Sequence, residues 1–277
     1  MAIVTFWSDS RKDTAQTSSA LAIATHMSME KNMRILLIDA KFCDESITRA
    51  YWKQQKESKF LKELNRGKID ISSGADGLVS AIASNKATPE IIANFTKGVF
   101  KNRLDILPGL KTKSPTEFEK SLVYYKDLLL NANKFYDIVF VDLEKTSEKP
   151  TVRALLDTSS IVMYTMTPDL MIIDQYVESL KKYAFLQKNN VIPIIGRSDE
   201  LSKYNPSNVA KKIGSKGGMA FIPYNIRYAE ATYEGNISKY FLNIKNGAYD
   251  EREQLFMDGI NDTIERILYK IEELQIR

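Results

Sequence analysis

The sequence predicts an α/β fold in which helices cover both faces of a doubly wound, mostly parallel β-sheet. Short β-rich runs alternate with longer helical stretches along the 277 residues. Most of these runs are continuously apolar, which is typical of strands buried on both faces of a parallel sheet. Repeated strand–helix alternation indicates an open α/β sheet, in which ligands bind at the carboxyl ends of the strands.

The predicted strands are short apolar runs spread over the whole chain. They are Ile3–Trp7, Ile35–Asp39, Leu104–Leu107, Ile138–Asp142, Ile161–Tyr164, Val191–Gly196 and Ala220–Ile222. The predicted helices lie between and after them. They are Thr17–Glu30, Gly77–Ser84, Thr116–Asn131, Asp174–Leu186, Asn208–Lys212 and Asp250–Gln275, with an inserted mixed-charge helix over Tyr51–Lys68 that would cover the site or meet a partner.

The last predicted helix, over residues 250–275, is amphipathic. Its apolar stripe consists of Leu255, Ile260, Ile264, Ile267, Leu268, Ile271 and Leu274. From Asp250 to Arg277 the chain has eight Asp or Glu against four Lys or Arg. A helix that anchors to a membrane surface needs a basic polar face, so we expect this stripe to dock on the sheet, without membrane insertion.

The composition predicts a globular cytoplasmic protein with a single domain over residues 1–277. Hydrophobic residues make up 44% and charged residues 27% of the chain, and no linker rich in Pro, Gly or Ser interrupts it. No apolar run reaches the ~18 residues of a transmembrane helix, and the N-terminus is expected to be a strand rather than a signal peptide. One cysteine, Cys43, and one histidine, His26, exclude an internal disulfide, a metal cluster based on them and a Ser-His-Asp triad.

The loop after the first strand is the expected position of the chemistry. Residues 8–16 join strand Ile3–Trp7 to the helix that begins near Thr17, and a P-loop would hold phosphates in such a unit with its backbone N–H groups. In the order of its elements the chain resembles the ParA/MinD family of deviant Walker P-loop ATPases, which includes the TadZ/CpaE-like members. The resemblance is carried by Thr17–Ala24, Arg34–Ala40, Leu104–Gly109, Phe135–Asp142, Ile222–Asn225, Glu230, Ala231 and Gly235.

The same loop departs from the family pattern, which reads Lys-Gly-Gly-Val-Gly-Lys-Thr. The aligned residues here are Arg11, Lys12, Asp13, Thr14, Ala15, Gln16 and Thr17. All three glycines, which allow unusual dihedral angles and a close approach to phosphate, are absent. Gln16 replaces the phosphate-binding lysine, Arg11 replaces the signature lysine, and Asp13 adds a negative charge that opposes ATP. Lys41 stands where the family has the acid that positions the attacking water.

The resemblance therefore implies a degenerate Walker A motif. Its relic nucleotide-binding residues are Arg11, Lys12, Gln16, Thr17, Ser18, Asp39 and Asp142. Thr17 could contact Mg²⁺, and Asp39 and Asp142 would be relic metal or water contacts. Phosphoryl transfer depends on positioning and charge neutralisation, so we expect no catalytic residue, no resident metal and no cofactor. Two alternatives stay open. Arg11 and Lys12 could form a different phosphate clamp that still binds ATP–Mg, and Asp39 and Asp142 could be ordinary hydrogen-bonded strand ends.

The function that this resemblance implies is that of a ParA-like pseudo-ATPase. Such a protein would be a non-catalytic positioning or scaffold protein in partition or in the polar localisation of secretion or pilus machinery, as a homodimer or with a paralogous ParA-like subunit. The main alternative is a slow ATP-binding partition ATPase that binds DNA without sequence preference. Two further candidate functions are a plain DNA-binding accessory and a sensor of another anion, such as a signalling nucleotide.

Basic residues cluster between Lys181 and Lys216. Lys181, Lys182, Lys211 and Lys212 are the candidate DNA-binding residues, since relatives bind DNA through a basic face of their late helices. Such binding would be salt-sensitive phosphate contact. The alternative is an ordinary solvated surface, because no motif for reading bases accompanies these lysines.

Overall fold

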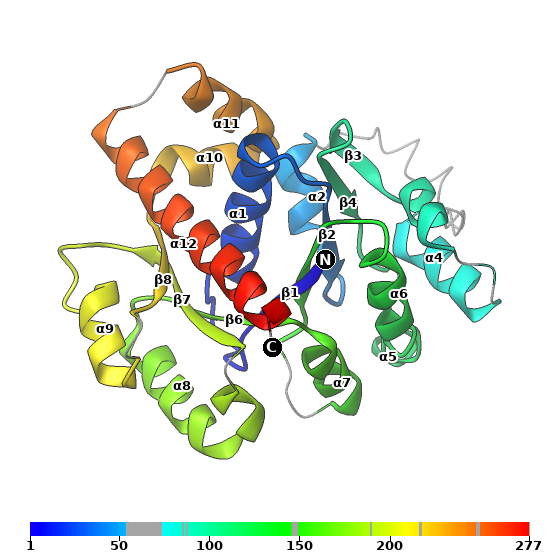
Figure 1. Cartoon of the computed structure of the whole chain (residues 1–277), viewed down its shortest axis with the longest axis horizontal. Helices are drawn as coiled ribbons and strands as arrows, with labels where there is room; N and C mark the ends of the chain where they lie inside the picture. Colours follow the sequence, from blue (N-terminus) through cyan, green and yellow to red (C-terminus); the bar gives the residue numbers. More distant parts are fainter. Residues whose placement is uncertain are drawn as a thin grey trace.

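The computed structural model describes residues 1–53, 74–84, 86, 88–145, 149–188, 190–215, 218–247 and 250–276. Within these residues, one eight-stranded sheet runs through the middle of the molecule in the order β3-β4-β2-β5-β1-β6-β7-β8 (Figure 1). The chain starts at the centre of the sheet with β1 and later returns to that centre with β5 and β6. This is the doubly wound α/β class that the alternation of elements predicted.

All strand pairs are parallel except the pair at one edge, β3 and β4. The strands are β1 (Ala2–Trp7), β2 (Ile35–Ala40), β3 (Lys97–Phe100), β4 (Leu104–Leu107), β5 (Ile138–Leu143), β6 (Ile161–Met166), β7 (Val191–Ser198) and β8 (Ala220–Pro223). Every residue of the central strands β1, β2, β5 and β6 is buried. The seven strands expected from continuous apolar runs are confirmed.

Strand β3 is the one strand among the described residues that the apolar runs did not predict. It has two exposed residues, Lys97 and Gly98, and its pairing with β4 contains an irregularity between Gly98 and Phe100. An antiparallel edge strand is covered on one side only and tolerates charge and glycine. Such a strand has no continuous apolar run to reveal it.

Helices cover both faces of the sheet, and each face has its own core. One face carries α1 (Gln16–Glu30), α2 (Ser46–Tyr51), α10 (Ile226–Glu234), α11 (Ile237–Lys245) and α12 (Glu251–Ile276). The other carries α4 (Gly74–Ala83), α5 (Pro115–Leu122), α6 (Tyr125–Ala132), α7 (Pro150–Thr158), α8 (Leu170–Lys182) and α9 (Pro206–Ile213), with the 3₁₀ turns η1 (Pro89–Phe95) and η2 (Ala184–Gln187) nearby. Alternate residues of β1 feed the two cores, because successive side chains of a strand point to opposite faces.

Three predictions about helices need correction. The helix expected over Asp174–Leu186 begins at Leu170 and ends at Lys182, and the 3₁₀ turn η2 follows it. The single helix expected over Thr116–Asn131 is two helices, α5 and α6, because a break at Val123 and Tyr124 lets both segments bury their apolar side chains while these two residues stay exposed. Leu255 does not belong to the buried stripe of α12, since its side chain is 49% exposed. Ile260, Ile264 and Ile267 are buried, and α12 packs along β8 as expected.

The helix predicted over Tyr51–Lys68 lies almost entirely outside the described residues. Tyr51 itself ends α2, a short helix that the sequence did not predict. Helices α7, α10 and α11 were not predicted either, although α10 contains Glu230 and Ala231 and ends against Gly235, three residues that carry the family resemblance. Among the described helices, none combines the length and the apolar character needed to cross a membrane.

Candidate functional site

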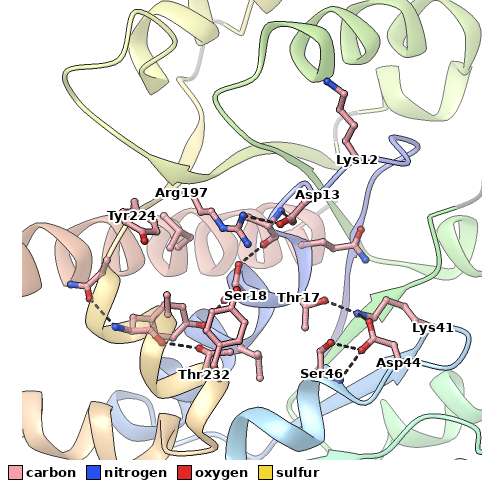
Figure 2. Close-up of a pocket in the computed structure, with 18 of the residues that line it drawn as sticks. Lys12, Asp13, Thr17, Ser18, Lys41, Asp44, Ser46, Arg197, Tyr224 and Thr232 are labelled. Atoms are coloured by element: carbon pink, nitrogen blue, oxygen red, sulfur yellow. Dashed lines mark hydrogen bonds and ion pairs between the residues drawn. The ribbon is translucent and has the colours of Figure 1, made fainter.

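The candidate site lies where β1, β2 and β5 end, at the carboxyl edge of the sheet. A pocket of about 770 Å³ opens there. Its walls come from the loop before α1, the loop after β2 and the start of α10, and Figure 2 shows their side chains converging. This is the edge at which an open α/β sheet binds its ligands, and the sequence pointed to it.

The loop before α1 keeps an unusual backbone without glycine. Ala15 has φ 55° and ψ 23°, the left-handed conformation, directly before the first residue of the helix. It stands at the position of the third glycine of the family pattern. A left-handed conformation is unfavourable for alanine by about 1–2 kcal/mol, so contacts elsewhere must hold it. One of these is a hydrogen bond from the Ala15 N–H to Asp13 Oδ1, 2.9 Å long.

Asp13 places a carboxylate against the loop's own backbone. Besides accepting from Ala15, its other oxygen, Oδ2, pairs with Arg197 at 2.7 Å, and Figure 2 shows the two side chains meeting above the pocket. Burial opposes ionisation, but the Ala15 N–H and the Arg197 guanidinium outweigh it, and the pKa of Asp13 is lowered. The backbone donor that a P-loop offers to phosphate is thus used by an internal anion.

Gln16, at the position of the phosphate-binding lysine, turns to the sheet. Its Nε2 donates to Asp142 Oδ1 at 2.6 Å and to the carbonyl oxygen of Leu143 at 2.7 Å. The side chain is buried, with 3% exposure for the whole residue. Both amide hydrogens are therefore engaged at the end of β5, and this side chain presents neither charge nor a free donor to the pocket.

Lys41 lies between the loop, β2 and β5. Its Nζ donates to Thr17 Oγ1 at 2.6 Å and to Asp44 Oδ2 at 2.6 Å, and it pairs with Asp142 Oδ2 at 2.8 Å. Thr17 Oγ1 in turn donates to Asp142 Oδ2 at 2.7 Å. Burial alone lowers the pKa of Lys41, but the carboxylates of Asp142, Asp39 and Asp44 outweigh that effect and raise the pKa above its usual value.

This arrangement does not fit a magnesium ion. In P-loop nucleotidases Mg²⁺ is held by the hydroxyl of the loop Ser or Thr and by the Walker B acid near the end of its strand. Here those two groups are Thr17 and Asp142, and both contact the ammonium of Lys41. Across the ranges that the structure describes, no group of three or more His, Cys, Asp or Glu side chains is arranged to hold a metal.

Asp39 lies beside Asp142 in the sheet register and is fully buried. Its Oδ1 accepts the N–H of Lys41 at 3.2 Å, while Oδ2 has no hydrogen-bond partner among the described residues. Burial, together with the charge of Asp142, raises the pKa of Asp39 well above its ordinary value despite the opposing attraction of Lys41. The two strand-end acids thus lie in different surroundings, one enclosed by donors and the other nearly without them.

The structure brings four of the predicted residues together, namely Gln16, Thr17, Asp39 and Asp142. Arg11, Lys12 and Ser18 line the pocket without joining that cluster. Lys12 extends away from it (Figure 2) and pairs with Asp169 on the approach to α8 at 2.9 Å, while Ser18 donates to the Ala15 carbonyl at 3.0 Å.

The sequence placed Lys41 at the site only as a lost acid, and it did not indicate Asp44, Lys145 or Arg197 as pocket residues. Lys145 donates to the carbonyl oxygen of Lys12 at 2.6 Å, and Arg197 holds Asp13. Lys145 follows the end of β5, and Arg197 lies at an irregularity in β7 with φ 53°. The rule that sites gather at the carboxyl ends of strands could have indicated both positions.

The four candidate DNA-binding lysines end two neighbouring helices. Lys181 and Lys182 lie in the last turn of α8, and Lys211 and Lys212 lie in the last turn of α9. Lys212 forms an ion pair with Asp174 at 2.8 Å, and the Lys182 ammonium lies 4.9 Å from the centre of the Tyr183 ring. The two pairs of lysines therefore belong to helices that pack together, and at least one lysine already has an acidic partner.

No protein-family model and no curated protein matches this sequence. Solved structures do match. A ParA family ATPase from Chlorobium tepidum TLS is 17% identical, with 87% of this chain and 91% of that chain covered and a TM-score of 0.66. The septum site-determining protein MinD from Pyrococcus horikoshii OT3, complexed with Mg-ADP, is 15% identical, covered at 97% and 98%, with a TM-score of 0.65. A plasmid partition protein from Borrelia burgdorferi is 19% identical, covered at 87% and 98%, with a TM-score of 0.53.

Proposed function

We propose that this chain, whose fold is that of the ParA and MinD ATPases, is a positioning or scaffold protein that works without hydrolysing ATP. The observation that carries the proposal is the carboxylate of Asp13 on the N–H of Ala15, 2.9 Å away. A negative charge in the cradle repels a triphosphate and uses a donor that would bind it. The loop is thus closed by its own side chain.

The position of Gln16 supports the same proposal. A lysine there would neutralise charge on the transferred phosphate. Loss of one such stabilising group commonly raises the activation free energy by about 2.7–4 kcal/mol. Gln16 carries no charge, and its amide is held by Asp142 and Leu143. Hydrolysis would therefore lack the phosphate-binding lysine at position 16 and also the water-positioning acid that Lys41 replaces.

Calorimetric titration with ATP and ADP in the presence of Mg²⁺, combined with a phosphate-release assay, tests the proposal. We expect no saturable heat and no phosphate release above that of buffer. Thr17→Ala is the matched control, because it removes the one hydroxyl that would contact Mg²⁺. Saturable ATP binding with phosphate release that Thr17→Ala abolishes would refute the proposal.

A scaffold that has no ATP cycle must assemble without nucleotide. We therefore propose a homodimer, or a pair with a paralogous subunit, that forms independently of ATP. Analytical ultracentrifugation of the chain alone, with and without ATP–Mg, should give the same dimer in both conditions. A strict monomer in both would contradict the homodimer, and a dimer only with ATP would favour a partition ATPase that assembles on nucleotide.

The size of the pocket favours one alternative, a slow ATP-binding partition ATPase with sequence-independent DNA binding. About 770 Å³ remain beside the closed loop, enough for a small-molecule ligand. This alternative predicts ATP-dependent assembly and duplex binding that weakens steeply with salt. Changing Lys211 and Lys212 together would weaken that binding, and absence of binding at low salt would exclude it.

A further inference from the structure

We infer that the ammonium group of Lys41 is a built-in replacement for the divalent cation of this site, and that its removal uncovers a magnesium site formed by Thr17, Asp44 and Asp142. This inference rests on the proposed function. The site needs no metal because the ammonium of Lys41 supplies the positive charge. Metal would then have no part in ordering these segments in the natural chain.

Two hydrogen bonds and one ion pair surround the ammonium group of Lys41. An ammonium group has three N–H donors, and here three oxygens lie at hydrogen-bond distance from Nζ, at 2.6 Å for Thr17 Oγ1, 2.6 Å for Asp44 Oδ2 and 2.8 Å for Asp142 Oδ2. Figure 2 shows Thr17 and Asp44 on either side of this group. A side chain that only rested in the pocket would not have three oxygens this close to its nitrogen.

Burial makes this cation necessary. The Asp142 side chain has no exposure to solvent, and that of Lys41 has 10%. A carboxylate removed from water needs a positive or hydrogen-bonded partner. Lys41 supplies that charge and ties together three segments that are distant in sequence, the first turn of α1, the loop after β2 and the end of β5.

The oxygens around Nζ also have the chemistry of a magnesium site. Mg²⁺ takes oxygen ligands at about 2.0–2.1 Å, commonly one or two carboxylates with water in the other positions. Magnesium–oxygen contacts are shorter than the present ammonium–oxygen contacts by roughly half an ångström. Without the ammonium, the oxygens of Thr17, Asp44 and Asp142 would therefore each have to move inward by about that distance to bind the ion. Water can enter because Asp44 is 27% exposed.

The test compares the thermal stability of the full chain and of Lys41→Ala over a titration with MgCl₂, without nucleotide. Lys41→Ala should melt lower than the natural chain without metal, because it leaves the buried Asp142 carboxylate without its charged partner. Added Mg²⁺ should raise its Tm, by about 5 °C or more once the ion reaches ~100 times its Kd. The natural chain should not respond. Mn²⁺ titration followed by electron paramagnetic resonance should count one bound ion in the variant and none in the natural chain.

Lys12→Ala is the matched control, since Lys12 lines the same pocket but pairs with Asp169. Its melting should not depend on Mg²⁺. If Lys41→Ala does not fold without metal, recovery of the fold by Mg²⁺ supports the inference; Lys41→Met, which keeps the bulk of the side chain, then repeats the titration. The inference is wrong if the natural chain binds Mn²⁺, or if both Lys41 variants respond no more than Lys12→Ala. Hydrolysis of ATP by the natural chain would refute the proposed function alone, because no nucleotide enters this assay.

Discussion

Gly196 lies where β7 passes the start of α1, and a methyl group added there has no room. A Cβ at this position would lie 2.5 Å from the Cβ of Ala15 and 2.8 Å from Ser19 Oγ. Ala15 is itself buried, with 3% exposure, in the left-handed conformation that shapes the loop. The missing side chain of Gly196 and the methyl group of Ala15 are therefore complementary. Gly196→Ala should force the loop and β7 apart.

The expected cost follows from the two contacts. Overpacking by a methyl group typically costs about 1–3 kcal/mol. The Ser19 hydroxyl can rotate away, but the Cβ of Ala15 is fixed by the backbone and cannot. In a chain of this size about 1 kcal/mol corresponds to ~2–4 °C in Tm. We therefore expect Gly196→Ala to melt about 2–12 °C lower. Ala15→Gly in the same chain removes the closer contact and should recover about 1 kcal/mol, while the contact with Ser19 stays.

Urea unfolding of the four chains of this double-mutant cycle, followed by circular dichroism, measures the coupling. Gly98→Ala is the control, because Gly98 also lies in a strand but its added Cβ would meet only Asp105 Oδ1, at 3.4 Å. That variant should unfold within about 1 kcal/mol of the natural chain. Additive effects of Gly196→Ala and Ala15→Gly would show that these two residues do not touch as described, and the reasoning would fail.

Two other predictions concern pH and helix ends. Burial lowers the pKa of His26 below its ordinary 6.5, although its hydrogen bond to Asn261 opposes this. As the pH falls, the unfolded chain therefore takes up the proton first, so the free energy of unfolding should be full above pH 6.5 and fall below it. His26→Gln should flatten that fall in urea titrations from pH 7.5 to 5. An unchanged dependence of the free energy of unfolding on pH would contradict this. Gly235→Ala should lower the stability more than Gly214→Ala does. Both glycines have φ +72°, a conformation that costs alanine about 1–2 kcal/mol. Of the two, only Gly235 would bring its added Cβ against backbone, 2.6 Å from Lys53 N. Equal losses of Tm would refute this.

Much of the fold could be predicted because burial on both faces leaves a local trace. The runs Ile35–Asp39 and Ile138–Asp142 are apolar up to their final aspartate, since helices cover both sides of the strands that contain them. Strand β3 has no such trace, because it lies at an edge with Lys97 and Gly98 exposed. The sequence did not reveal the break between α5 and α6 for a related reason. The helical spacing of apolar residues continues through it, and only packing against the rest of the protein decides where the helix is interrupted.

The sequence alone determined which residues the loop before α1 contains, because the absence of glycine and the presence of Gln16 are matters of residue identity. Only the tertiary structure decided what these residues contact. Lys41 was seen in the sequence as a lost acid, yet its ammonium lies on Thr17 and on Asp142, which are 125 residues apart. Asp13 was seen as a repelling charge, yet it holds the N–H of Ala15. Such contacts form because strands that are distant in sequence end next to one another in the sheet, and because buried charges must be paired. No local pattern of residues shows either of these.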